Sequence, residues 1–359
     1  MPRPAKKHPV VKRGHRFLAS TIGNLAAVSA SRRLLGRRES RRPDPEAGEP
    51  LGALCGERHI LRGPKASRLY SEVFPAEGPC AGTVIFTHGW CLTEAVWHYQ
   101  KRDLTGNNLA LVTWDLPGHG HSSPISVEHL SLEVGADALA RVVERHAEGG
   151  VILVGHSLGG VITLGYLARH AAQASDVVRG AVLVSTPAMH FAHSVAGGWP
   201  GARLEARALG RVMQYVVESS LADRILAGDV GKEESTRLSY AVARIGFGRA
   251  PSATQVRFVR DVIASVPPGV RADTYRTMTG HDLRPILPRI KTPSLVVLGT
   301  RDRLVNPEES RMLAARLPHG RAIVGDEVGH AAFLESHEWF NDHVRRFAAA
   351  RFRGTRAAG

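Results

Sequence analysis

A Gly-x-Ser-x-Gly pentapeptide carries the clearest chemical signal in this chain of 359 residues. Gly155-His156-Ser157-Leu158-Gly159 directly follows the apolar run 151–154, and the apolar stretch 161–169 comes next. A serine hydroxyl becomes a useful nucleophile when a tight turn holds it beside a base and beside donors for an oxyanion. Glycines permit such a turn, because a Cβ at their positions would collide with neighbouring backbone. The pattern therefore predicts a strand, a turn and a helix that present Ser157 as a nucleophile.

Two later segments supply the base and the carboxylate that such a serine requires. Asp302 follows the apolar run 294–298, and His330 follows the last strand that the sequence predicts. Taken singly, Asp302 is equally an ordinary turn aspartate and His330 an ordinary loop or core histidine. Their order along the chain, Ser157 then Asp302 then His330, is the one expected for a serine nucleophile on a mostly parallel sheet. We expect His330 to take the Ser157 proton and Asp302 to fix the tautomer of His330.

An oxyanion site completes the predicted constellation. The tetrahedral intermediate of acyl transfer carries a negative charge that must meet donors already in place. His88-Gly89-Trp90 closes the predicted strand 83–87, and Leu158 begins the helix after the serine turn. We expect the backbone N–H groups of Trp90 and Leu158 to be the two donors.

These side chains require a scaffold of alternating strands and helices, and the chain has that pattern from about residue 58 onward. The predicted strands are 83–87, 109–114, 151–154, 181–185, 294–299 and 322–324, and the predicted helices are 130–147, 161–169, 308–317 and 337–350. Such alternation predicts an α/β fold with a mostly parallel, doubly wound sheet that is covered on both faces. Ligands of open sheets of this kind bind at the carboxyl ends of the strands.

The alternation stops for about a hundred residues, where only helical patterns occur. Examples are 204–217, 233–245 and 253–266. We interpret this stretch as a helical cap inserted over the carboxyl ends of the strands. The predicted organisation is a basic segment with linker (1–55), a first core part (56–186), the cap (187–287), a second core part (288–350) and a basic tail (351–359).

The net charge of +14 is concentrated at the N-terminus. Residues 1–42 hold twelve Lys and Arg side chains against one Glu, so eleven of the fourteen net charges lie there. The rest of the chain therefore makes no strong electrostatic demand for a polyanion, and nucleic acid is not an expected partner, because Phe17 is the only aromatic residue in the basic segment. We interpret the segment as an amphipathic helix for an anionic membrane surface on a cytoplasmic protein. A tail without a partner and a weak export signal remain as alternatives.

The three cysteines lack the spacing of metal ligands. Cys55, Cys80 and Cys91 are an odd and sparse set, which indicates a reducing compartment and no disulfide framework. Cys91 lies close to the predicted oxyanion loop, where a small buried side chain is the simpler interpretation than a functional thiol. We predict neither a metal nor a cofactor.

Together these motifs make residues 60–350 similar to the α/β-hydrolase superfamily, in the branch with a His-Gly oxyanion motif and a helical cap after the sixth strand. The loop 114–122 resembles the loop that follows the fourth strand in that family, which implies structural roles for Asp115, His119 and His121. Haloalkane dehalogenases and epoxide hydrolases carry an aspartate where this chain has Ser157. The resemblance therefore implies an acyl-enzyme rather than an alkyl-enzyme intermediate.

The resulting prediction is a serine hydrolase that cleaves a carboxylic ester. Cap residues such as Trp199, Met213, Tyr215 and Phe247 favour an apolar or lipid-like acyl or alcohol group, although the same residues at helical spacing also suit ordinary packing. An acyltransferase and a cofactor-free perhydrolase or haloperoxidase would use the same three residues. A non-catalytic binding protein of the same fold is the alternative from another class.

Overall fold

The computed structural model describes residues 44–106, 108–189, 240, 243–279 and 281–353. The chain divides into two compact units, Met1–Ala47 and Gly48–Gly359, and the fold below is that of the second unit. Several predictions lie outside the described residues: the basic segment 1–42, the helix 204–217, most of the helix 233–245, the cap residues Trp199, Met213 and Tyr215, and the end of the basic tail.

Eight strands of the described residues form one sheet, and six of them overlap strands that the sequence predicts. They are β1 (Glu57–Arg62), β2 (Arg68–Phe74), β3 (Gly82–Thr87), β4 (Leu109–Trp114), β5 (Val151–His156), β6 (Val178–Val184), β7 (Ser294–Gly299) and β8 (Gly320–Gly325). Their order across the sheet is β1-β2-β4-β3-β5-β6-β7-β8. The pairings of β2 with β1 and with β4 are antiparallel, and all the others are parallel. The prediction of a mostly parallel sheet is confirmed.

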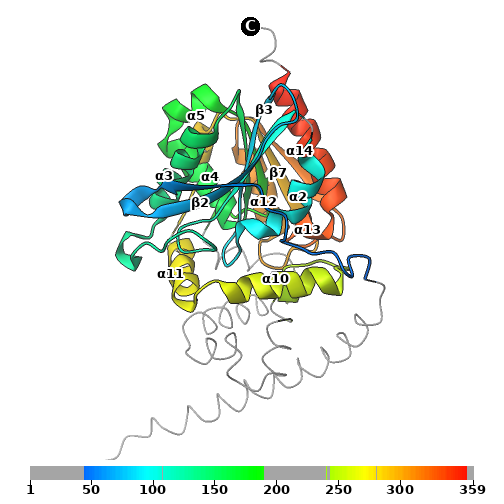
Figure 1. The fold of residues 1–359 in the computed structure, drawn as a ribbon. Coiled ribbons are helices and arrows are strands. Elements are labelled where there is room, and N and C mark those ends of the chain that lie inside the picture. The colour runs from blue at the N-terminus through cyan, green and yellow to red at the C-terminus, as the bar shows by residue number, and fades with distance from the viewer. Residues whose placement is uncertain (1–43, 107, 190–239, 241–242, 280, 354–359) are drawn as a thin grey trace, which may run out of the picture. The chain divides into compact units, whose positions relative to one another are not determined.

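Helices cover both faces of the sheet (Figure 1). One face carries α3 (Leu132–His146), α4 (Leu158–Arg169), α5 (Ala171–Val177) and α12 (Pro307–Arg316), and the other carries α2 (His98–Leu104), α13 (Ala332–Glu335) and α14 (His337–Phe352). Short 3-10 helices occur at η1 (Pro64–Ala66), η2 (Glu94–Trp97), η3 (Val127–His129) and η4 (Leu287–Arg289). Each face of the sheet packs into its own apolar cluster, so the described part of the chain has two cores separated by the strands.

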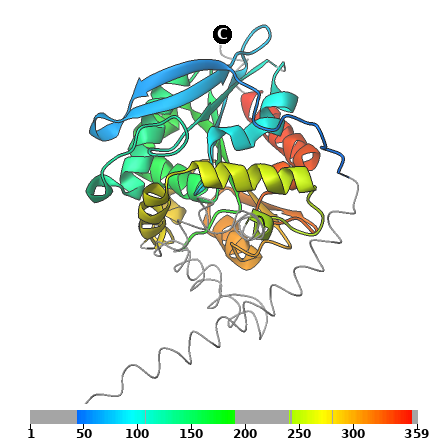
Figure 2. The same ribbon diagram turned by 60° about the horizontal axis from the view of Figure 1, so that its bottom comes forward.

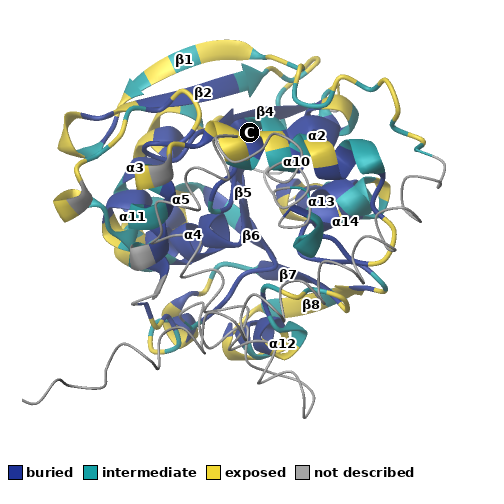
Figure 3. Ribbon diagram, turned by 90° about the horizontal axis from the view of Figure 1, so that it is seen from below, coloured by how far each residue is buried: buried dark blue, intermediate teal, exposed yellow. Residues whose placement is uncertain are grey.

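The burial of the central strands explains why they can be recognised in the sequence. Every residue of β3, β4, β5 and β7 is buried, and Figure 3 shows this buried centre between more exposed edges. A strand covered on both faces needs a continuous apolar run, which is what the sequence carries there. The predicted strands 109–114 and 294–299 coincide with β4 and β7.

The antiparallel pair β1 and β2 is an element that the sequence pattern did not reveal. β1 is an edge strand with the sequence ERHILR, and its largest apolar side chain, Ile60, is 61% exposed. Charged side chains on an edge strand discourage pairing with another chain, but they also remove the apolar run that identifies a strand.

Two helices lie across the carboxyl ends of the strands (Figures 1 and 2). They are α10 (Ala253–Ser265) and α11 (Pro268–Thr279), and they belong to the stretch predicted as a cap. α10 begins with a capping box in which Ser252 and Gln255 satisfy each other's backbone amides, which fixes where the helix starts. Among the described residues of 187–287, helical turns are the only regular structure apart from one isolated bridge between Met189 and Asp282.

No helix in the described part of the chain combines the length and the apolar character needed to cross a membrane.

Candidate active site

Ser157 lies in a sharp turn between β5 and α4. Its backbone has φ 52° and ψ −114°, a conformation that costs a non-glycine residue about 1–3 kcal/mol and persists only where the surroundings enforce it. The backbone N–H of Ser157 donates to the carbonyl of Val184 on the neighbouring strand at 2.8 Å. The residue is 4% exposed, so the turn holds its hydroxyl in a protected site.

Close backbone packing leaves no room for side chains at the glycines around Ser157. A Cβ on Gly155 would lie 2.6 Å from the carbonyl oxygen of Gly159, and a Cβ on Gly159 would lie 2.3 Å from that of Thr87. A Cβ on Gly160 would lie 2.0 Å from Oγ1 of Thr186. The glycines of the pentapeptide are therefore required, because the backbone of the turn at Ser157 packs against β3 and against itself.

Asp302 and His330 meet at the carboxyl end of the sheet. Nδ1 of His330 lies 2.9 Å from Oδ2 of Asp302, and the two side chains are 8% and 2% exposed. The other carboxylate oxygen, Oδ1, accepts from the backbone N–H groups of Leu304 and Val305 at 2.8 and 2.9 Å. With a carboxylate as its partner, Nδ1 carries the proton, so Nε2 of His330 keeps its lone pair. That is the tautomer that a general base for serine needs.

Glu335 holds the loop that carries His330. Its Oε2 accepts from the backbone N–H of Gly329 at 2.9 Å and from that of Gly248 at 2.7 Å. A Cβ on Gly329 would lie 2.3 Å from the nitrogen of Gly248, so the two loops are in backbone contact. Glu335 was not predicted from the sequence, because a lone glutamate at the end of a short helix has no distinguishing pattern.

His156 connects the turn at Ser157 with the loop that carries His330. Its Nε2 lies 3.2 Å from the carbonyl oxygen of His330, and the two imidazole rings are 4.6 Å apart in an edge-on arrangement. Burial lowers the pKa of His156 well below its ordinary value, and the neighbouring His330 lowers the pKa further. His156 is therefore neutral and donates its Nε2–H to His330. Its role was not predicted from the sequence, because it occupies a variable position of the pentapeptide.

The predicted oxyanion donors lie on two segments that touch. A Cβ on Gly89 would lie 2.6 Å from Nδ1 of His156, which places the loop after β3 against the turn after β5. Leu158 is the first residue of α4, and the first amides of a helix have no acceptor within that helix. On the other segment, the indole N–H of Trp90 donates to the carbonyl of Arg271 on α11 at 2.9 Å, and its ring packs 5.4 Å from that of Tyr275.

The polar residues of the loop 114–122 make contacts within and behind that loop. Asp115 is fully buried and accepts from the backbone N–H groups of Glu94 and His121, each at 2.8 Å. His119 is also buried, and burial together with His88 lowers its pKa to about 3. These contacts fit the structural roles that the family resemblance implies for the loop.

Cys91 is buried directly after Trp90. Burial raises the pKa of its thiol far above the ordinary value, so the reactive thiolate is not accessible near neutral pH. Within the described residues, no group of three or more His, Cys, Asp and Glu side chains has a geometry that could hold a metal ion.

Comparison with known proteins agrees with this fold. A family model for the alpha/beta hydrolase fold matches residues 82–337. The pimeloyl-[acyl-carrier protein] methyl ester esterase of Xanthomonas campestris pv. campestris is 30% identical over 286 residues, which cover 74% of this chain and 95% of that protein. The chain belongs to the alpha/beta hydrolase family.

Two solved structures are similar in fold. The esterase EaEST from Exiguobacterium antarcticum has a TM-score of 0.66 at 19% sequence identity, and the match covers 81% of this chain and 98% of that one. The esterase RhEst1 from Rhodococcus sp. ECU1013 has a TM-score of 0.65 at 23% identity, with 82% and 99% covered. At these identities the likeness concerns the fold alone.

Proposed function

We propose that this esterase-like enzyme hydrolyses a carboxylic ester through an acyl-enzyme on Ser157. The observation that carries the proposal is the hydrogen-bonded pair of Asp302 and His330, in the tautomer of a general base, linked through His156 to a strained serine turn. The relatives named as esterases support the same reaction class.

The proposed reaction has two halves. His330 takes the proton of Ser157 on Nε2 while the serine oxygen attacks the ester carbonyl, and the Asp302 carboxylate stabilises the imidazolium that forms. The negative charge on the carbonyl oxygen rests on the amides of Trp90 and Leu158. His330 then protonates the departing alcohol, and the acyl group remains on Ser157. Water deprotonated by His330 attacks this ester, which releases the carboxylic acid and returns the proton to Ser157.

The proposed substrate is an ester with an apolar acyl chain and a small alcohol. The relative from Xanthomonas campestris is named for a methyl ester of a pimeloyl group on an acyl-carrier protein, which supports this class. Among the four cap residues named from the sequence, Phe247 is the described one, and it is fully buried in the apolar cluster that contains Val328 and Ala331. Phe247 therefore packs against the loop that carries His330, and it gives no direct support for an apolar substrate pocket.

The test is turnover of a panel of methyl and p-nitrophenyl esters of graded acyl length by the full chain. We expect the wild type to hydrolyse at least one series with a clear optimum in chain length, and the Ser157→Ala variant to be inactive on all of them. Parallel reactions with added alcohol or hydrogen peroxide separate transfer to another acceptor from hydrolysis. No turnover of any ester by folded wild type would contradict the proposal.

A further inference from the structure

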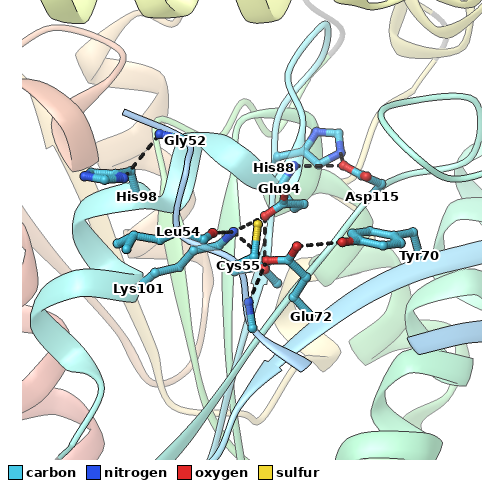
Figure 4. Close-up of polar contacts among 12 residues, drawn as sticks. Gly52, Leu54, Cys55, Tyr70, Glu72, His88, Glu94, His98, Lys101 and Asp115 are labelled. Carbon is cyan, nitrogen blue, oxygen red and sulfur yellow. Dashed lines mark hydrogen bonds and ion pairs between the residues drawn. The ribbon is translucent and has the colours of Figure 1, made fainter. Parts of the chain in front are cut away.

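A cluster of buried charged side chains lies close to His88, the first residue of the loop that also contains Trp90 (Figure 4). It consists of Glu72 on β2, Glu94 at the start of η2, Lys101 on α2 and Asp115 after β4, and we refer to these four as the carboxylate cluster. Each of the four is at most 6% exposed. Nζ of Lys101 donates to Glu94, to Oε2 of Glu72 at 2.9 Å and to the carbonyl of Leu54 at 3.2 Å.

Asp115 of this cluster holds one end of the loop 88–94, and Leu116, the residue that follows Asp115, holds the other end. At the far end, Oδ1 of Asp115 accepts from the backbone N–H of Glu94 at 2.8 Å. At the near end, the backbone N–H of Leu116 donates to Nε2 of His88 at 3.0 Å, while Nδ1 of His88 donates to the carbonyl of Gly89 at 2.8 Å. Two consecutive residues after β4 thus fix both ends of the short loop that contains Trp90.

Charge and burial determine how firmly this arrangement is held. A buried carboxylate is strongly destabilising unless charged or hydrogen-bonding partners surround it. Asp115 has two backbone donors, and Glu72 has the ammonium of Lys101, the hydroxyl of Tyr70 at 2.6 Å and the backbone N–H of Gly56 at 3.3 Å. The carboxylates of Glu72 and Glu94 therefore share the ammonium of Lys101, whereas that of Asp115 is held by the backbone N–H groups of Glu94 and His121.

The pKa shifts of Glu94 and His88 are consistent with these contacts. Burial raises the pKa of Glu94 to about 7, although Lys101 opposes the rise, and Asp115 and Glu72 add to it. Burial lowers the pKa of His88, so its ring is neutral and its Nε2 can accept from Leu116. Because Nε2 of a neutral His88 carries no proton, its 3.8 Å approach to Oδ1 of Asp115 is not an ion pair.

We propose that Asp115 is a positioning residue for the oxyanion amide of Trp90. The inference rests on the proposed function, because the Trp90 amide meets an oxyanion only in an acyl-transfer reaction. Asp115 touches no reacting atom. It acts through the backbone of the loop 88–94, which it fixes at Glu94.

The expected effect follows from the tolerance of oxyanion donors to displacement. Such donors must lie about 2.7–3.1 Å from the oxyanion, and removing one costs about 100-fold to 1,000-fold in kcat. A misplacement of about 1 Å costs on the order of 100-fold. Asparagine at position 115 has one acceptor oxygen for two N–H donors, so one of the contacts with Glu94 and His121 is lost. Alanine has no side-chain acceptor, so the contact that holds the end of the loop at Glu94 is lost in every case.

The experiment compares wild type with Asp115→Asn and with Asp115→Ala on a soluble short-chain ester and on a trifluoromethyl ketone that forms a tetrahedral adduct with the serine. We expect kcat/KM and the inhibitor affinity to fall in parallel by about 10-fold to 100-fold, through kcat rather than KM. The matched control is Asp137→Asn, since Asp137 is a carboxylate on α3 that pairs with Arg169 and His170 away from the site. It should leave both quantities unchanged.

The opposite end of the loop provides a second variant if Asp115→Asn does not fold. Asparagine at position 88 is too short to reach Leu116, so His88→Asn should lower inhibitor affinity and kcat/KM together in the same way. Folded Asp115→Ala or His88→Asn protein with the inhibitor affinity and kcat of wild type overturns the positioning role. Wild type that neither hydrolyses esters nor reacts with the ketone overturns the proposed function instead, so the two failures are distinguishable.

Discussion

The turn at Ser157, proposed to hold the nucleophile, and the loop 88–94, proposed to supply an oxyanion donor, are neighbours that are held in place by different means. Around Ser157 the backbone itself fixes the geometry, because Gly155 and Gly159 bring main-chain atoms too close for any side chain. The loop 88–94 depends instead on a buried side chain at each end: His88, its first residue, accepts from the backbone N–H of Leu116, and Asp115 accepts from that of Glu94. His156 touches both regions, since it packs on Gly89 and donates to the carbonyl of His330.

This difference explains which structural contacts produce a recognisable sequence motif. Steric contact between backbones requires glycine, so the turn leaves a pattern that is easily read. Side-chain hydrogen bonds to backbone can be made by residues of many types from distant positions, so the loop leaves almost none. The two regions should also respond differently to substitution, and four variants test that expectation.

Asp302→Asn should have the largest effect, because it breaks a side-chain contact at the base itself. The asparagine amide would face Nδ1 of His330 and favour the tautomer that lacks a lone pair on Nε2. We expect kcat to fall about 10,000-fold with little change in stability. Steady-state kinetics on the best ester measure it. The control is Asp326→Asn, which alters an exposed turn carboxylate bonded to Thr300 and should leave kcat unchanged.

Gly159→Ala should disrupt the turn at Ser157, whose geometry is fixed by contacts between backbone atoms. The new Cβ would meet the carbonyl oxygens of Thr87 and His88 at 2.3 and 2.6 Å, so β3 and α4 must separate. We expect a loss of about 1–3 kcal/mol in the free energy of unfolding and at least about 100-fold in kcat/KM. Urea denaturation and ester kinetics measure the two quantities.

Gly165→Ala is the matched control on the same helix. A Cβ there would lie 3.7 Å from Cβ of Ala136, which is an ordinary contact, so alanine should be neutral or stabilise the protein by up to about 1 kcal/mol. Equal effects of the two alanine variants would contradict the view that backbone contact fixes the turn.

His156→Phe should have a smaller effect at the junction of the two regions. Phenylalanine fills the same buried space beside Phe333 but removes the N–H that His156 donates to the carbonyl of His330. We expect kcat/KM to fall about 10-fold, because the base loses one positional restraint. His343→Phe removes a ring nitrogen that contacts the carbonyl of Trp339 on α14, and it should not change the kinetics. Unchanged kinetics in His156→Phe would show that the turn and the base are positioned independently.

Glu94→Gln should have the smallest effect on activity and a pH-dependent effect on stability. The glutamine retains the backbone N–H that Asp115 accepts, so kcat/KM should stay within about threefold of wild type. Burial raises the pKa of Glu94 from 4.5 to about 7, so the folded state binds this proton more tightly than the unfolded state. Its contribution to stability is fully present below pH 4.5 and is lost as the pH rises through 7.

Urea unfolding at pH 5 and pH 8 measures that contribution. Wild type should lose about 1–3 kcal/mol more than Glu94→Gln between the two pH values. A difference of the opposite sign would mean that the ion pair with Lys101 outweighs the burial of Glu94.

Much of the fold could be predicted from sequence, and so could the residues that form one contact of the candidate site. Buried parallel strands are continuous apolar runs, so β4 and β7 were placed correctly, whereas the exposed edge strand β1 has no such run. The order of Ser157, Asp302 and His330 at strand ends indicated a serine site, and the structure brings Asp302 and His330 within hydrogen-bonding distance.

The supporting contacts could not be predicted, because they join ordinary residue types that are far apart in the chain. Lys101 meets Glu72 across 29 positions, and His156 meets His330 across 174. Glu335 illustrates the same problem, since its three partners are backbone amides that any residue other than proline could supply. Burial and geometry, rather than residue type or spacing, define these roles.

The most direct test of the central claim is active-site labelling of the full chain with a fluorophosphonate probe. Wild type should be labelled at Ser157, as peptide mapping would identify, and the Ser157→Ala variant should remain unlabelled while it unfolds at the same urea concentration. A folded wild type that does not react, or labelling that persists in Ser157→Ala, would contradict the assignment of Ser157 as the nucleophile.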